Sequence, residues 1–239
     1  VVVVSLAVGL SVASRNITNI RTSTQTEESQ KAFSAAEGGI EYILSQDLAT
    51  VPVDNTVTVS DKVTTNVNVT KSSTFEAQIA PGSVEQIKLD AGSSGKSILI
   101  QWAKTGETPG ASVEITYVYG SGSNANYRWA YSGGSAGSNE TGFATPSGSC
   151  GNYQKCVTIA LTSPLHDNPT LLRIRPFWGT NTFNISGTGG YSLPTQTYTL
   201  KSTASTADGI TRTVQVTKTL PQLPAVFDYA VYSDSPISK

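Results

Sequence analysis

The first proline of the chain is Pro52, and the long proline-free stretch before it constrains the fold more than any other feature. Apolar residues fill Val1–Ala13, polar residues continue to Lys31, and apolar residues return at helical spacing over Phe33–Leu44. The sequence therefore predicts one helix from about Val1 to Leu48. At 1.5 Å per residue this helix is about 70 Å long, and Pro52 forces it to end.

A helix of this length exceeds the diameter of a domain, so one core cannot bury it. Its middle, "SRNITNIRTSTQTEESQK", contains only Ile17 and Ile20 as large apolar residues. Lys31 lies three and four residues after two glutamates, which supports a helix weakly, whereas the threonines oppose one. One end of the helix should protrude, and its apolar tip should need a partner from another chain.

The apolar tip, "VVVVSLAVGLSVA", is too short to cross a bilayer core, since thirteen helical residues span about 20 Å. Three interpretations stay open at this point. The tip is a remnant of a signal peptide, a buried core helix, or a helix that lies in a membrane first and later packs against other copies. Small residues among the valines would let apolar helices approach closely.

The segment "KAFSAAEGGIEYIL" places two adjacent glycines inside the predicted helix, each costing about 1 kcal/mol relative to alanine. Small residues leave room for a sheet or a neighbouring helix to come close. We therefore expect this segment to pack beneath a β-rich region. The predicted packing residues are Phe33, Ala36, Gly39, Ile40, Ile43 and Leu44.

Beyond Val53 the sequence alternates apolar and polar residues in short segments such as "NTVTVS" and "TNVNVT", which is typical of half-buried strands. Such segments recur about every 10 to 15 residues between turn signals and extend to "FDYAVYS". They predict a sandwich or a strongly curved antiparallel sheet packed on the Phe33–Leu44 face of the helix. A hairpin is expected to turn at Asp208-Gly209.

The predicted domains are an assembly helix over residues 1–50 and a β-rich globular head over 51–239. The helix has an exposed half, about 1–30, and a packed half, about 31–48. Charged residues make up 14% of the chain, and its net charge is −1. This composition resembles that of extracellular β-proteins and argues against nucleic acid as a partner, which requires a basic patch.

The two cysteines, Cys150 and Cys156, are separated by five residues. This spacing is neither a redox nor a zinc motif, so the sequence predicts a disulfide and an oxidising compartment; two free thiols are the alternative. His166 is the single histidine, and "HDNP" around it is more simply a turn than a catalytic pair. No enzyme activity, cofactor or metal is predicted.

The stretch from Gly120 to Cys156 is the longest turn-rich part of the chain and contains aromatic residues such as Trp129 and Phe143. Long loops often have functional roles. One interpretation is an exposed surface for recognition or filament contact. The other is a loop-rich surface that covers buried aromatic side chains.

One segment resembles a known family. "SQKAFSAAEGGIEYIL", preceded by an apolar helix, is similar to the N-terminal region of PilX-like type IV pilins and related pseudopilins, and Leu220–Ser233 resembles the end of such proteins. The matching residues are Ser29, Ala32, Phe33, Ala35, Ala36, Glu37, Gly39, Ile40 and Glu41. The resemblance implies an α+β fold in which a long N-terminal helix packs against a large antiparallel β-rich region.

The resemblance further implies a structural subunit of an extracellular type IV pilus-like filament on the cell surface. Its partners would be identical or related pilin subunits, the inner membrane before assembly, the prepilin peptidase and the pilus assembly machinery. A minor, tip-located pilin that acts as an adhesin or assembly initiator is the alternative. Typical pilins have a glutamate at the fifth position, where this chain has Ser5. The predicted filament-core residues are Val1, Val2, Val3, Val4, Leu6, Val8, Leu10, Val12, Ile17 and Ile20.

Overall fold

The computed structural model describes residues 2–60, 63–120, 125–134, 141–148, 150–162 and 168–224. It contains one long helix, α1, and twelve strands in its described part. The elements are α1 (Val2–Leu44), β1 (Asp54–Ser60), β2 (Val63–Ser72), β3 (Phe75–Ile79), β4 (Glu85–Lys88), η1 (Ala91–Ser93), β5 (Ser97–Lys104), β6 (Ser112–Tyr119), β7 (Ala125–Tyr131), β8 (Tyr153–Ala160), β9 (Pro169–Phe177), β10 (Asn181–Gly187), β11 (Thr197–Ser205) and β12 (Thr211–Thr219).

The expected fold class, an α+β pilin-like fold, is wrong. Strands account for 47% of the chain and helix for 19%, so the protein is a β-rich fold of mostly antiparallel sheets. The reason is that α1 covers only one small sheet, whereas the strands of the other two sheets pack against one another. Within the described residues, no helix combines the length and apolar character needed to cross a membrane.

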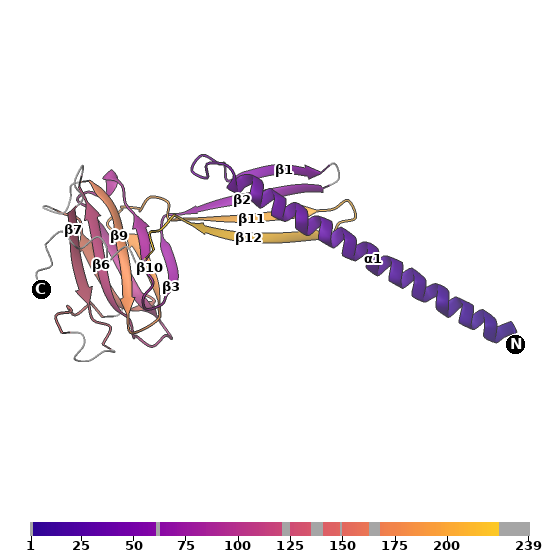
Figure 1. Cartoon of the computed structure of the whole chain (residues 1–239), viewed down its shortest axis with the longest axis horizontal. Helices are drawn as coiled ribbons and strands as arrows, with labels where there is room; N and C mark the ends of the chain where they lie inside the picture. The colour runs from indigo at the N-terminus through magenta and orange to yellow at the C-terminus, as the bar shows by residue number, and fades with distance from the viewer. Residues whose placement is uncertain are drawn as a thin grey trace, which may run out of the picture. The chain divides into compact units, whose positions relative to one another are not determined.

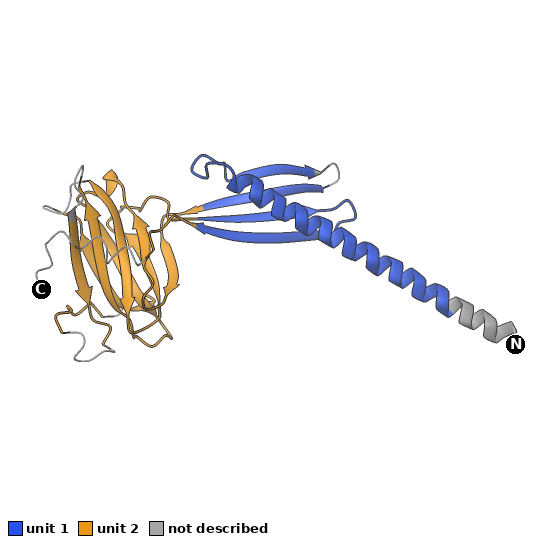
Figure 2. Cartoon of the chain, in the orientation of Figure 1, with its two compact units in different colours: residues 1–70, 198–218 blue, residues 71–197, 219–239 orange. Residues whose placement is uncertain are grey.

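The chain divides into two compact units, shown in Figure 2. Unit 1 comprises residues 1–70 and 198–218, and unit 2 comprises residues 71–197 and 219–239. The predicted domain boundary lay near residue 50, between the assembly helix and the β-rich head. The chain therefore leaves unit 1 at the end of β2, forms most of unit 2, and returns to unit 1 at β11.

Unit 1 consists of α1 and a four-stranded sheet in the order β1-β2-β11-β12 (Figure 1). Strand β1 pairs antiparallel with β2. Along β2 the side chains alternate, with Val67 and Val69 buried against the helix and Asn66 exposed. The predicted hairpin at Asp208-Gly209 joins β11 to β12, since Thr206 N donates to Ile210 O at 3.0 Å and Gly209 adopts a φ of 81°.

Helix α1 ends at Leu44, four residues before the predicted end. Ser45 is the first residue outside it, and its hydroxyl donates to Tyr42 O at 2.7 Å. Asp47 then begins a turn in which its carboxylate accepts from Ala49 N at 3.0 Å. Leu48 belongs to this turn and still packs into the core of unit 1. Local hydrogen bonds made by Ser45 and Asp47 thus end the helix before Pro52 can act.

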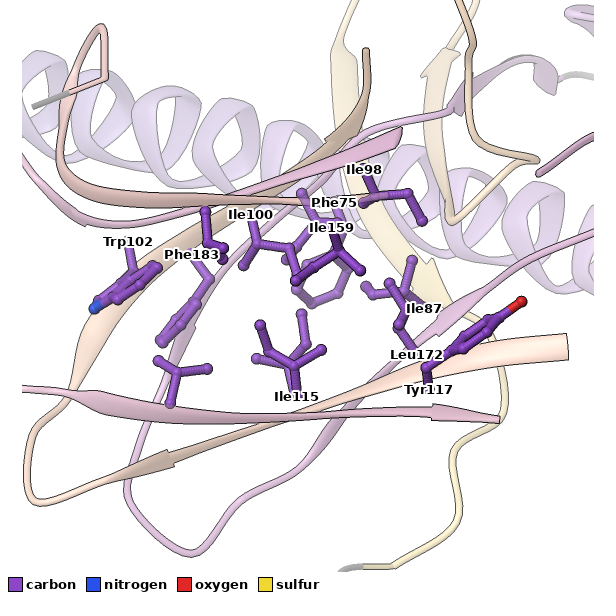
Figure 3. Close-up of a cluster of buried hydrophobic side chains, with 14 of the residues drawn as sticks. Phe75, Ile87, Ile98, Ile100, Trp102, Ile115, Tyr117, Ile159, Leu172 and Phe183 are labelled. Carbon is purple, nitrogen blue, oxygen red and sulfur yellow. The ribbon is translucent and has the colours of Figure 1, made fainter. Parts of the chain in front are cut away.

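Unit 2 is a sandwich of two four-stranded antiparallel sheets, in the orders β3-β10-β5-β8 and β4-β9-β6-β7. Side chains from the inner faces of both sheets form one core, drawn in Figure 3. The rings of Trp102 and Phe183 stack there with centroids 6.3 Å apart, and Trp102 Nε1 donates to Ala111 O at 2.9 Å. A sandwich is therefore present, as one of the sequence alternatives stated, but α1 packs on the separate sheet of unit 1.

The predicted disulfide between Cys150 and Cys156 is present in unit 2, with Cα atoms 6.1 Å apart. It closes a tight turn in which Cys150 N donates to Tyr153 O at 2.8 Å. The amide of Gln101 donates to Cys150 O at 2.7 Å and ties the turn to β5. His166 and the segment "FDYAVYS" lie outside the described residues.

Candidate assembly surface

Every residue of α1 from 11 to 27 is exposed, whereas partial burial begins at Glu28 and buried residues recur at helical spacing from Ala32 to Ile43. Figure 1 shows α1 extending past the ends of β1 and β2. The sheet is shorter than the helix because its strands have 7 to 10 residues and rise about 3.3 Å per residue. A helix of 43 residues is about 65 Å long, so much of it has no sheet beneath it.

The exposed stretch contains apolar side chains that a solvated helix does not need. Ile17 is 54% exposed and Ile20 is 65% exposed. At about 100° per residue these two side chains and Ala13 fall within about 60° of one another, on one face of the helix. Val12, 54% exposed, lies about 140° from Ile17 on another face. The three-four spacing of Ala13, Ile17 and Ile20 is typical of a seam between two helices.

The predicted filament-core residues are described only in part. Val12, Ile17 and Ile20 are exposed in the single chain, as a surface for other copies requires. Val1 lies outside the described residues, and so do the side chains of Val2, Val3, Val4, Leu6, Val8 and Leu10. The spacing of Ala13 with Ile17 and Ile20 was missed from the sequence, although the positions alone would have revealed it.

Threonine hydroxyls in the exposed half of α1 donate to carbonyl groups of the helix itself. Thr18 donates to Ser14 O at 3.0 Å, Thr22 to Thr18 O at 2.9 Å, and Thr26 to Thr22 O at 2.8 Å. Each hydroxyl thus finds an acceptor one turn earlier on the helix. The polar composition of this stretch is therefore compatible with a continuous helix, despite the low helix propensity of threonine.

Three polar contacts mark the point where α1 reaches its sheet. The Lys31 amine lies 2.9 Å from both Glu27 Oε1 and Glu28 Oε1. Hydrogen bonds that the amine donates to Glu28 and then to Glu27 raise the pKa of Lys31 above its usual value, so the amine stays charged. On β12, Arg212 Nε donates to Ser29 Oγ at 2.8 Å. These contacts fix the position at which the exposed half of α1 begins.

The packed half of α1 uses small side chains to approach the sheet. A Cβ atom on Gly39 would lie 2.6 Å from Thr65 Cγ2, 3.0 Å from Ser202 Oγ and 3.1 Å from Val67 Cγ2, so any side chain there would clash. Thr65 also donates from its hydroxyl to Ala35 O at 3.2 Å. The backbone of α1 is therefore in direct contact with the sheet at this turn of the helix.

Five of the six predicted packing residues lie on or beside this contact. Ala36, Ile40 and Ile43 are buried, Gly39 is buried between β2 and β11, and Leu44 packs at the edge of the cluster. The prediction for Phe33 is wrong, because its side chain is 45% exposed. The buried stripe is centred between Ala36 and Gly39, and Phe33 projects about 90° from that centre.

The turn between β11 and β12 lies beside the exposed half of α1 within unit 1. A shallow groove runs between them. Ile20 of the helix and Ile210 of the turn contribute its apolar side chains, and Asp208, Arg21 and Glu28 contribute charges. An apolar side chain from another molecule can enter this groove beside Ile20. The groove thus extends the apolar face of the helix toward the sheet.

Within the described ranges, no group of three or more His, Cys, Asp or Glu side chains is gathered closely enough to hold a metal ion. The surface of α1 instead offers contacts of the helix-packing kind. No protein-family model matches the chain, and no curated protein is significantly similar to it in sequence.

Proposed function

We propose that this chain is a structural subunit of an extracellular type IV pilus-like filament and that it polymerises through the exposed half of α1. The observation that supports the proposal is the seam of Ala13, Ile17 and Ile20, which a single chain leaves in water. The likeness of Ser29–Glu41 to PilX-like pilins is consistent with this function.

The energetics favour contacts with several neighbours rather than one. Burying an isoleucine fully contributes about 1.5–3 kcal/mol, and association costs about 4–15 kcal/mol in lost freedom of motion. Ile17 and Ile20 therefore cannot hold a pair of subunits alone. Identical subunits that join head to tail without closing build an open helical filament, in which each helix meets more than one neighbour.

Before assembly, the proposed filament subunit would depend on a membrane and on dedicated machinery. The inner membrane, a prepilin peptidase and the pilus assembly machinery remain predicted partners, and the cell surface remains the predicted location. These predictions rest on the sequence likeness alone. The central claim, self-association through α1, can be tested without them.

The test is the double variant Ile17→Asp/Ile20→Asp, examined by electron microscopy and analytical ultracentrifugation. Charges at the seam should abolish filaments and leave a folded monomer, because burying an unpaired carboxylate is costly. The matched control is Asn19→Asp/Thr22→Asp, which adds the same charge to exposed positions roughly opposite the seam. Filament formation by the seam variant would refute an interface at Ile17 and Ile20. An equal loss of filaments in the control variant would refute it as well.

A minor, tip-located subunit that initiates assembly or adheres to a surface is the second candidate. The observation in its favour is unit 2, a sandwich with its own core inserted between two strands of unit 1. Such a unit can bind a target while α1 holds the subunit in place. The proportion of this chain in sheared filaments separates the two candidates: a dominant gel band supports the main subunit, and a trace supports the tip.

A further inference from the structure

Unit 2 presents a cluster of aromatic rings at the end of β9. The ring centroid of Trp178 lies 5.5 Å from that of Phe177 and 5.8 Å from that of Phe143, and Phe143 lies 6.4 Å from Phe177. The Trp178 side chain is nevertheless 47% exposed. A half-exposed tryptophan supported by two other rings presents apolar surface to solvent.

The backbone at Trp178 is strained. Its φ is 59°, in a region that bulky residues rarely adopt, and Gly179 N donates to Phe177 O at 2.9 Å. A three-residue turn with positive φ at its centre is rare, and such strain typically costs about 1–3 kcal/mol. Tryptophan at this position is therefore unfavourable for folding, which points to a role outside the fold.

Dense packing holds the strained turn in place. A Cβ atom on Gly179 would lie 2.4 Å from the carbonyl carbon of Gly110 and 2.6 Å from Ala111 N. Asn181 reinforces this contact, since its Oδ1 accepts from Ala111 N at 2.9 Å and from Gly110 N at 3.1 Å. The turn after β9 is thereby fixed to the loop between β5 and β6.

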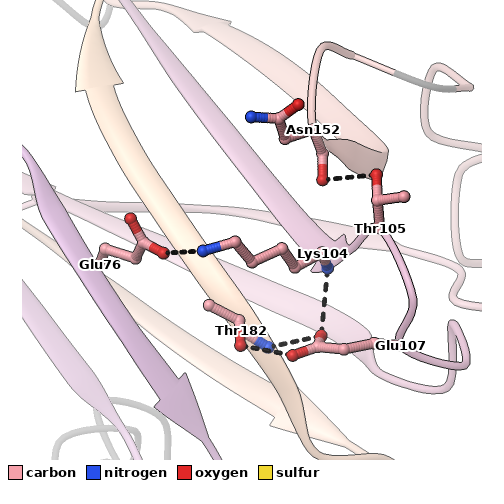
Figure 4. Close-up of polar contacts among 6 residues, drawn as sticks. All are labelled: Glu76, Lys104, Thr105, Glu107, Asn152 and Thr182. Atoms are coloured by element: carbon pink, nitrogen blue, oxygen red, sulfur yellow. Dashed lines mark hydrogen bonds and ion pairs between the residues drawn. The ribbon is translucent and has the colours of Figure 1, made fainter.

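Glu107 completes the attachment, as Figure 4 shows. Its carboxylate accepts from Thr182 N at 2.9 Å, from the Thr182 hydroxyl, and from Lys104 N at 3.1 Å. Asn181 Nδ2 donates to the same carboxylate at 3.2 Å. These contacts keep the loop and the start of β10 together, so the ring of Trp178 is presented on a rigid support rather than on a free loop.

Arg175 distinguishes the rings within the cluster. Its guanidinium carbon lies 4.9 Å from the centroid of Phe177, a cation–π distance. Phe177 thus contacts a cation and two neighbouring rings. Trp178, the one ring of the three that is exposed, is left as the apolar surface available to a ligand.

The size of this surface indicates what it can bind. A fully buried aromatic side chain removes about 150–250 Å² from water, so a half-exposed tryptophan and the neighbouring ring edges offer about 200–300 Å². A stable protein interface needs about 800 Å² on each partner. The cluster is too small for a protein partner on its own, but it matches one or two sugar rings.

We propose that Trp178 is the stacking platform of a carbohydrate-binding site and that its ligand is a β-linked pyranose chain. The axial C–H bonds of such a ring form a flat face with a weak positive charge, and the face of an indole ring is negative. The two faces attract and exclude water from each other. This site lies in unit 2 and does not depend on the proposed filament function.

Binding is tested with two defined probes, cellohexaose and chitohexaose, by calorimetric titration of the full chain. The titration uses the Ile17→Asp/Ile20→Asp background, so that filament formation does not affect the result. We expect millimolar or tighter binding of at least one probe. Trp178→Leu should weaken it about tenfold or more, because leucine keeps an apolar surface but lacks a π face.

Tyr127→Ala is the matched control, since Tyr127 is 45% exposed and lies outside the cluster. It should bind the probes as the parent does, and thermal melts should show all variants folded. Absence of binding in the parent would overturn the proposal, and so would equal binding by Trp178→Leu. Loss of filaments on introducing Trp178→Leu into the native chain, with no sugar bound by the parent, would make the cluster a subunit contact instead.

Discussion

Units 1 and 2 bury apolar surface in different ways. In unit 2 the two sheets cover each other, and bulky side chains such as Trp102, Phe183 and Ile115 are fully buried. In unit 1 a single sheet covers the end of a long helix. The small residues Gly39 and Ala36 let the helix backbone lie close to the strands of that sheet. The comparison teaches that unit 2 completes its own core, whereas unit 1 leaves apolar side chains of α1 exposed.

The two units can be followed separately in one experiment. All three tryptophans, Trp102, Trp129 and Trp178, belong to unit 2, and α1 belongs to unit 1. Tryptophan fluorescence therefore reports unfolding of unit 2, and circular dichroism at the helical band reports unfolding of unit 1.

The largest effect is expected for Phe183→Ala in unit 2. Phe183 is fully buried and stacks on Trp102, so truncation should lower the free energy of unfolding by about 3–5 kcal/mol. Denaturant titration should show the loss in the fluorescence transition, with the helical transition unchanged. Thr158→Ala, at an exposed position of β8, is the control and should cost less than about 1 kcal/mol. If both transitions shifted together, the two units would not be energetically separate.

Removing the disulfide should have the next largest effect. The link joins residues six apart, and the chain-entropy model gives about 2 kcal/mol for so short a loop. Cys150→Ser/Cys156→Ser should lower the stability of unit 2 by that amount in denaturant titrations. A reductant should reproduce the loss in the native chain and leave the double variant unaffected. A shift of the helical transition would break the proposed division between the units.

Two glycine substitutions probe unit 1. Gly39→Ala should destabilise it by about 1–2 kcal/mol, because the new Cβ would lie 2.6 Å from Thr65 Cγ2 and overpacking outweighs the gain in helix propensity. Gly38→Ala is the matched control, since its nearest contact is 3.4 Å, to Val59 Cγ1. It should stabilise by about 0.5–1 kcal/mol. The helical transition measures both, and stabilisation by Gly39→Ala would contradict the close approach of helix and sheet.

The smallest effect concerns Glu107 in unit 2. Burial opposes ionisation of this carboxyl, but hydrogen bonds from Thr182, Asn181 and the Lys104 amide outweigh it and hold the pKa of Glu107 below its usual 4.5. Because the folded pKa is the lower one, this stabilisation is complete above pH 4.5 and is lost as the pH falls through the folded pKa.

Glu107→Gln should therefore cost about 1 kcal/mol at neutral pH and flatten the acid dependence of the fluorescence transition. Glu76→Gln is the comparison, because Glu76 forms a solvent-exposed pair with Lys104 at 2.7 Å. It should cost less than Glu107→Gln at neutral pH. Equal losses in the two variants would show that the loop attachment contributes no more than a surface ion pair.

Local patterns predicted the strands well. Alternation of valine with asparagine or threonine identified β1 and β2, and the Asp-Gly pair identified the turn between β11 and β12. These signals are visible in the sequence because neighbouring residues determine them. The disulfide was equally accessible, since Cys150 and Cys156 are close in the chain.

The order of the strands was not predictable in the same way. Strand β2 neighbours β11, which begins at Thr197, and no local pattern shows that two segments so distant in sequence will pair. The division into two units follows from that pairing and was missed with it. A single β-rich head was expected because strand-like segments recur from β1 to β12 with no second long helix between them.

In the helix too, local sequence patterns did not show which single residues would contact the sheet. Phe33 fits the apolar spacing of the packed half, yet the sheet contacts the stripe of small residues that includes Ala32, Ala36 and Gly39. Side-chain size was the better guide to the covered face than hydrophobicity. The aromatic cluster around Trp178 was also missed as a unit, because Phe143 and Trp178 meet only through the fold of unit 2.

The adjacency of Ser72 and Gln196 has a consequence for the order of folding. Gln196 N donates to Ser72 O at 2.8 Å, so the chain enters and leaves this part of unit 2 at one place. During synthesis, β1 and β2 must wait for β11 before their sheet can close. Once unit 2 has folded, the long connection between β2 and β11 acts as a short one. The entropy cost of bringing these two strands together then falls by about 3–4 kcal/mol. Unit 2 then serves as an internal folding aid for unit 1.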